Sequence, residues 1–148
     1  MSKEETLKKI AEMADKNKDE LSKKVDAKAR AMELVRDVVF PYLNSYTKPL
    51  SELGIVTEVF NHGLEARMRV KEVGGFSMGP ICSLGVEYTG MSGEGFDAYY
   101  WPPLDEKIRL SGIRFDQDDE GIKASIDKLI ARVSEELFSQ AKALERGE

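Results

Sequence analysis

The sequence predicts a single α+β domain of two layers, in which helices cover one face of a five-stranded antiparallel sheet. Apolar residues recur at helical spacing near both ends of the chain. Between these segments the apolar period changes to two, which is typical of strands. Short connections join the strands, so consecutive strands are expected to pair as a meander. A sheet with one apolar face needs a covering layer, which the two helical segments can supply.

The first helical segment is expected to run from residue 3 to about residue 46. Its apolar stripe consists of Leu7, Ile10, Ala14, Leu21, Val25, Met32, Val35, Val39, Tyr42 and Tyr46. Asn17 interrupts this pattern, so the segment is either one long helix or two helices with a break near residues 15–19. Pro41 is expected to kink the helix or to end its regular part. The sparse stripe before Leu21 predicts that residues 1–20 form a mobile or partner-binding helical arm.

The middle of the chain predicts five strands and two glycine-rich loops. The strands are expected at residues 55–60, 64–71, 81–88, 96–101 and 107–115. In the second strand, apolar residues that face the core (Leu64, Ala66, Met68, Val70) alternate with polar residues that face water (Glu65, Arg67, Arg69, Lys71). A β-bulge is expected at Ser111-Gly112, where the apolar parity shifts. The loop at residues 74–80 is expected to be flexible, with Phe76 and Met78 exposed.

The last element is expected to be a helix from Asp118 to Leu144. Its acidic first turn suits the positive end of the helix macrodipole. The 148 residues contain no linker or repeat, so residues 1–148 are predicted to form one domain.

Composition limits the classes of function that are expected. The single cysteine, Cys82, excludes an internal disulfide, lies in an apolar run and favours a reducing compartment. No signal peptide or membrane-spanning stretch is expected, so the predicted location is cytoplasmic, with no membrane partner. The net charge is -5: residues 1–50 hold 11 Lys+Arg against 9 Asp+Glu, and the rest hold 11 against 18. This balance argues against strong non-specific binding to nucleic acid.

Catalytic and metal sites have little support in the sequence. His62, the only histidine, lies in a predicted turn with no nucleophile signature nearby, as a solvated turn residue would. The acidic run at residues 116–121 has the alternate spacing of a calcium loop, but helix capping explains it without metal. The loops at residues 74–80 and 90–95 lack the lysine and the helix of a phosphate-binding loop. We therefore expect no cofactor and no metal, and a non-enzymatic function.

The open sheet face is the first candidate binding surface. Its candidate residues are Tyr99, Trp101, Arg67, Arg69, Lys71 and Arg109. Basic side chains interleaved with aromatics on a sheet can bind single-stranded nucleic acid or a small anionic ligand. The alternative is a solvated face in which Glu58, Glu65 and Glu87 pair with these bases across strands.

The aromatic run at residues 99–101 and the long N-terminal helix favour a different function. Surface aromatics are frequent anchors of protein interfaces. The leading hypothesis is a non-enzymatic protein-interaction module of the adaptor, chaperone or inhibitor type, whose partner is another protein or a second copy in a homodimer. The alternative hypothesis is a binder of a small anionic ligand or of single-stranded nucleic acid through the open face.

Overall fold

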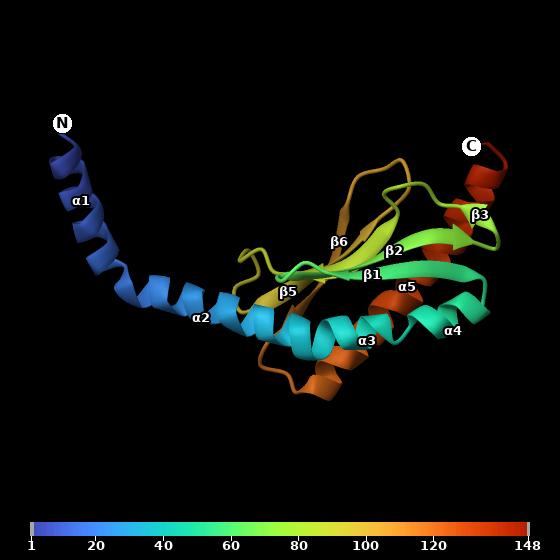
Figure 1. Ribbon diagram of the computed structural model, residues 1–148, viewed down its shortest axis with the longest axis horizontal. Coiled ribbons are helices and arrows are strands. Elements are labelled where there is room, and N and C mark those ends of the chain that lie inside the picture. The colour runs from blue at the N-terminus through green and yellow to red at the C-terminus, as the bar shows by residue number, and fades with distance from the viewer. Residues whose placement is uncertain (1, 148) are drawn as a thin grey trace.

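The computed structural model describes residues 2–147, and its architecture is the predicted one: helices lie on one face of an antiparallel sheet (Figure 1). The helices are α1 (Lys3–Lys16), α2 (Lys18–Leu34), α3 (Phe40–Asn44), α4 (Thr47–Glu52) and α5 (Asp119–Glu145), with a π-helical turn, η1 (Val35–Val39), between α2 and α3. The strands are β1 (Ile55–Asn61), β2 (Glu65–Val73), β3 (Phe76–Ser77), β4 (Ser83–Glu87), β5 (Gly95–Trp101) and β6 (Ile108–Arg114). The sheet order β1-β2-β4-β5-β6 is a meander, and β3 pairs with the end of β2.

The core lies between one sheet face and the helices. Ala66, Met68 and Val70 of β2 are buried in one cluster with Val35 of η1 and Ile126 of α5. The intervening residues of β2 point to the opposite face, which carries no helix. The predicted register of β2 is therefore confirmed, because a slip of one residue would exchange the two sets.

The N-terminal segment breaks at Asn17, so the two-helix alternative is the correct one. The Ser2 side chain caps α1 by accepting a hydrogen bond from the Glu5 N–H at 3.1 Å. Asn17 leaves helical geometry at φ -105° and ψ 14°, and its side-chain amide donates to the Met13 carbonyl at 2.7 Å. This local hydrogen bond competes with the helical ladder and stabilises the elbow between α1 and α2.

Regular α-helix ends at Leu34, seven residues before Pro41. Pro41 has no N–H, and its ring would clash with a carbonyl of the preceding turn. The wider η1 turn accommodates this constraint: the Phe40 N–H donates to the Val35 carbonyl, five residues back. The chain then continues as α3, in agreement with the expected disturbance at Pro41.

Two details of the sheet differ from the sequence prediction. The bulge lies at Leu110 rather than at Ser111-Gly112, because Tyr99 pairs with Arg109 while Ala98 pairs with Ser111. The parity shift was a correct sign of a bulge, but parity alone does not identify the inserted residue.

The loop at residues 74–80 is also more buried than predicted. Gly74 and Gly75 have φ of 60° and 81°, which permits a tight turn from β2 into the short β3. Phe76 is half-buried, and Met78, expected to be exposed, is completely buried. The turn returns the chain over the sheet, where the methionine side chain fills part of the core.

Within residues 2–147, no helix combines the length and the hydropathy needed to cross a bilayer.

Gly85 provides a test of this packing. A Cβ at Gly85 would lie 2.5 Å from the Ala66 carbonyl oxygen and 2.8 Å from the Tyr99 hydroxyl, whereas at Gly112 the nearest atom is 3.4 Å away on a flexible arginine. We expect Gly85→Ala to lower the free energy of unfolding by about 2 kcal/mol or more. Gly112→Ala, a mid-strand control, should change it by less than about 0.5 kcal/mol. Equal values in urea denaturation would show that the Gly85 site relaxes freely.

Candidate functional site

The sheet face that carries no helix, called here the open face, holds all six residues of the predicted site. The backbone register aligns Arg67, Gly85, Tyr99 and Arg109 in one row across β2, β4, β5 and β6. A neighbouring row contains Arg69, Ser83 and Trp101. Lys71 joins this face through its ion pair with Glu58, at 3.7 Å. The pairing of β2, β4, β5 and β6 therefore brings the predicted residues together.

Tyr99 is part of the framework of the open face and offers almost no surface to a ligand. Its side chain lies over Gly85, and its hydroxyl donates to a Glu65 carboxylate oxygen at 2.7 Å. The Lys107 ammonium lies 4.1 Å from the ring centroid, and Tyr99 is only 2% exposed. Burial raises the pKa of Tyr99, and the hydrogen bond to Glu65 raises it further. Tyr99 therefore remains a neutral donor that orients Glu65.

Four of the six basic side chains on this face are paired with carboxylates, among them Arg114 with Asp116 at 2.8 Å. Lys71 pairs with Glu58, and Lys107 pairs with Glu87 at 2.7 Å. The Arg109 Nε lies 2.5 Å from a carboxylate oxygen of Asp97. The cross-strand pairing considered from the sequence is thus partly present, and these pairs leave no continuous basic strip for a phosphate backbone.

Asp97 ties the loop at residues 89–95 to the sheet. Its carboxylate accepts hydrogen bonds from Ser92 Oγ at 2.5 Å, Thr89 Oγ1 at 3.1 Å and the Arg109 Nε. Burial alone would raise the pKa of Asp97, but the hydrogen bonds from Ser92, Arg109 and Thr89 together hold it below its usual value. Asp97 was not among the predicted residues. An aspartate inside a strand is uncommon, and that was the signal available in the sequence.

The two remaining bases, Arg67 and Arg69, have no carboxylate partner within the described chain. The Arg67 guanidinium lies 5.7 Å from the centre of the Trp101 ring, which is a cation–π contact. Trp101 is half-buried, and its indole N–H donates to the Asp105 carbonyl at 3.2 Å. Trp101 and the two arginines are therefore the part of the predicted site that remains available for binding.

His62, Cys82 and the acidic run occupy positions with simple structural roles. His62 is exposed and stacks on Phe60 with ring centroids 5.8 Å apart. Cys82 is buried, and burial raises the pKa of its thiol to about 11. Asp118 caps α5 by accepting from the Gly121 N–H at 2.7 Å. Across residues 2–147, no cluster of three or more His, Cys, Asp or Glu residues is arranged to hold a metal ion.

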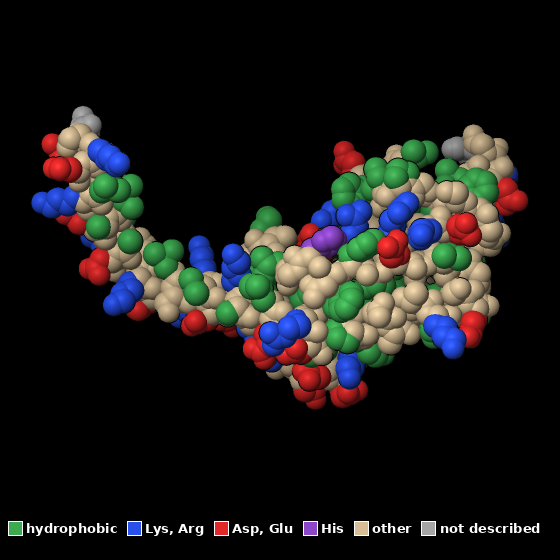
Figure 2. Space-filling model, in the orientation of Figure 1, with side chains coloured by type: hydrophobic (Ala, Val, Ile, Leu, Met, Phe, Trp, Pro, Cys, Tyr) green, Lys and Arg blue, Asp and Glu red, His purple; other side chains and the backbone are tan. Residues whose placement is uncertain are grey.

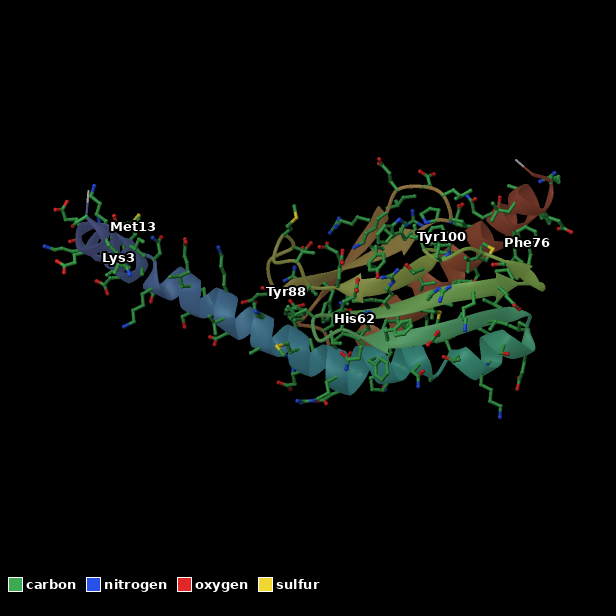
Figure 3. The ribbon with its side chains drawn as sticks, turned by 45° about the horizontal axis from the view of Figure 1, so that its top comes forward. Lys3, Met13, His62, Phe76, Tyr88 and Tyr100 are labelled. Carbon is green, nitrogen blue, oxygen red and sulfur yellow. The ribbon has the colours of Figure 1, made fainter. Side chains whose placement is uncertain are left out.

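The second candidate surface is the N-terminal arm, defined as Ser2 to Asp26. Every residue of the arm is exposed, and the first buried residue among those that the structure describes is Ala27. Figure 3 shows the labelled Lys3 and Met13 far from the rest of the molecule. The large apolar side chains of the arm, called here the arm stripe, are Leu7, Ile10, Met13, Leu21 and Val25, all between 46% and 67% exposed. The arm thus projects from the domain.

The arm bends at Asn17, and its apolar side chains lie along the inner side of the bend (Figure 2). A shallow hollow of about 380 Å³ at this elbow is lined by Ile10, Met13 and Leu21, together with Ala14, Asn17, Glu20 and Lys24. A second hollow, of about 630 Å³, lies where the base of the arm meets the loop after β4. Met91, 90% exposed, and Tyr88 line it together with Lys24 and Lys28.

Searches against protein-family models, curated proteins and solved structures each returned no significant match for this chain. We therefore infer its function from the geometry of these surfaces.

The Asp97 network predicts a pH-dependent stability. Because the folded-state pKa of Asp97 is depressed, its stabilisation is present above the ordinary pKa of 3.8 and is lost as the pH falls through the lower folded-state pKa. Asp97→Asn should therefore cost roughly 2 kcal/mol of unfolding free energy at pH 7, and the difference from wild type should shrink below about pH 4. Asp116→Asn, at an exposed pair with Arg114, is the control and should cost little at either pH. A pH-independent Asp97→Asn effect would contradict this account.

Proposed function

We propose that this protein is a protein-interaction module of the adaptor, chaperone or inhibitor type, and that it self-associates through its N-terminal arm. The observation that carries the proposal is a helical arm with an apolar stripe and no buried residue. Isolated helices of 12 to 15 residues are only marginally stable in water, and helices in proteins owe most of their stability to packing. None of the 14 residues of α1 is buried by another part of the described chain. A partner that covers the stripe would supply the missing stabilisation.

The point along α2 at which residues become buried favours a second copy as that partner. Beyond Ala27 the apolar side of α2 is covered by the sheet of the same chain, so only the arm itself is available. The arm is about 36 Å long at the helical rise per residue. A second arm that runs in the opposite direction fills this length and ends where the domain begins. A parallel second copy would instead bring its own domain against the domain of the first.

An antiparallel arrangement also matches apolar residues. When Ile10 of one copy faces Leu21 of the other, the twofold axis passes close to the elbow, and the interface uses the same surface on both copies. Residue 3 of the second copy then lies opposite residue 28, beside the larger hollow and its exposed Met91. Both hollows along the arm receive side chains from the second copy.

Substitutions in the arm stripe should convert the dimer to a monomer. We expect full-length wild-type protein to have the mass of a dimer at high micromolar concentration, measured by size exclusion with light scattering. Ile10→Gln combined with Leu21→Gln removes apolar surface from the stripe and should raise the dissociation constant by at least tenfold, a loss of about 1.4 kcal/mol or more. Lys8→Gln combined with Lys16→Gln, two arm residues that belong neither to the stripe nor to either hollow, should leave the dimer intact because glutamine has a similar helix propensity. A monomeric wild-type protein would rule out self-association.

Deletion of residues 1–20 distinguishes loss of the interface from loss of the fold. Because none of residues 2–20 is buried, the truncated protein should retain its circular dichroism and its urea-unfolding midpoint at protein concentrations where wild type is monomeric. It should also be monomeric at the concentrations where wild type dimerises. A truncated protein that unfolds would show that the arm supports the domain itself.

Cysteine cross-linking tests the direction of the arms. In the antiparallel dimer, Ile10→Cys protein mixed with Leu21→Cys protein should form a disulfide-linked heterodimer on mild oxidation. Each variant alone should cross-link poorly, because residue 10 and its own equivalent lie about 16 Å apart, beyond the reach of a disulfide. Cys82 does not compete, since it is buried with a thiol pKa of about 11 and the thiolate is the reactive form. Efficient homodimer cross-links would indicate a parallel arrangement.

A further inference from the structure

The open face contains an unusual imbalance among its charged groups. Four of its carboxylates are already engaged: Glu58 with Lys71, Glu87 with Lys107, Asp97 with Arg109, and Glu65 with the Tyr99 hydroxyl. Arg67 and Arg69, two residues apart on β2, point to this same face and have neither an ion pair nor a hydrogen bond within residues 2–147. Side chains at this spacing on a strand lie roughly 7 Å apart, so their guanidinium groups can converge on one ligand.

Two buried polar atoms beside these arginines also lack partners. The Arg69 Nε is buried without a hydrogen bond, and so is the hydroxyl of Ser83, a residue with no exposed surface. Ser83 is the cross-strand neighbour of both Arg69 and Trp101. A buried donor without an acceptor is costly and uncommon in folded proteins, so two of them in one cross-strand row point to an acceptor that the protein chain does not provide.

We propose that Arg67, Arg69 and Ser83, together with the indole of Trp101, form a binding site for an oxyanion, which is the phosphate or carboxylate group of a ligand. A guanidinium group presents two parallel N–H donors that match the geometry of such an anion. Arg69 as a residue is half-buried, and Trp101 holds Arg67 in place through the cation–π contact. The anion supplies the acceptor that Arg69 Nε and Ser83 Oγ lack. This inference is independent of the arm and goes beyond the self-association proposed above.

Trp101 is the only tryptophan of the chain, so its fluorescence reports directly on this site. The experiment is a titration of the full-length protein with sodium phosphate, and in parallel with sodium acetate, at constant ionic strength maintained with chloride. We expect a saturable change in Trp101 emission with a dissociation constant on the order of 1 mM for at least one of the two anions. Saturation by phosphate alone identifies phosphate as the ligand group, and saturation by acetate alone identifies a carboxylate. A change that never saturates, or that chloride reproduces, would overturn the proposal.

Variants separate binding from folding. Arg69→Gln should raise the dissociation constant of the anion by roughly tenfold, because it removes a charged, hydrogen-bonding partner. Arg114→Gln, whose ion pair with Asp116 lies outside the site, should bind as wild type does. Ser83→Ala should weaken binding while leaving the stability of the unliganded protein unchanged or higher, because it removes an unsatisfied hydroxyl. If Ser83→Ala destabilises the unliganded protein and leaves anion affinity intact, the hydroxyl has only a structural role and the site is wrong.

Discussion

A two-layer domain can cover only one face of its sheet with helices, and the other features of this protein depend on that constraint. Because residues alternate along β2, Ala66, Met68 and Val70 pack against the helices. Arg67 and Arg69 lie on the opposite face, which faces solvent. Since no second helix layer covers the open face, its polar groups have to satisfy one another across strands. The pairs from Lys71 to Glu58 and from Arg109 to Asp97 do this. The same constraint sets the limit of the arm, because α2 becomes buried only where the sheet lies beside it.

The fold was largely predictable because the signals that specify it are periodic and local. The period of two in β2, the helical stripe of α5 and its acidic N-terminal cap each indicate an element without knowledge of its neighbours. Errors arose where the conformation depends on tertiary contacts. Leu110 is the bulged residue because of how β6 meets β5, and Met78 is buried because β3 returns over the sheet. A sequence pattern shows that such an irregularity exists, but the position of the irregularity depends on the pairing partner.

The candidate site was predictable only as a set of residues on one face. Strand parity correctly placed Arg67, Tyr99 and Arg109 together, since parity follows from the period of a strand. Strand parity could not predict whether these side chains are exposed and unpaired. Tyr99 is buried because Gly85 leaves room for its ring and because Lys107, from the loop after β5, lies over it. Arg109 is neutralised by Asp97. Both effects depend on which side chains become cross-strand neighbours, and a shift of one residue in register would change all of them.

The N-terminal part of the arm lies on the same side of the molecule as the open face. Figure 1 shows α1 bending away from the helix layer, toward the side of the sheet that carries no helix. A second copy held by the arm would therefore approach from the side of the open face. Charged groups on that face act on an approaching copy over about 8 Å at physiological salt, which is the screening length. An oxyanion bound by Arg67 and Arg69 would lower the positive charge there by one or two units. Binding of a small anion would then alter the association of two copies through their electrostatic field, without contact between the anion and the arm stripe.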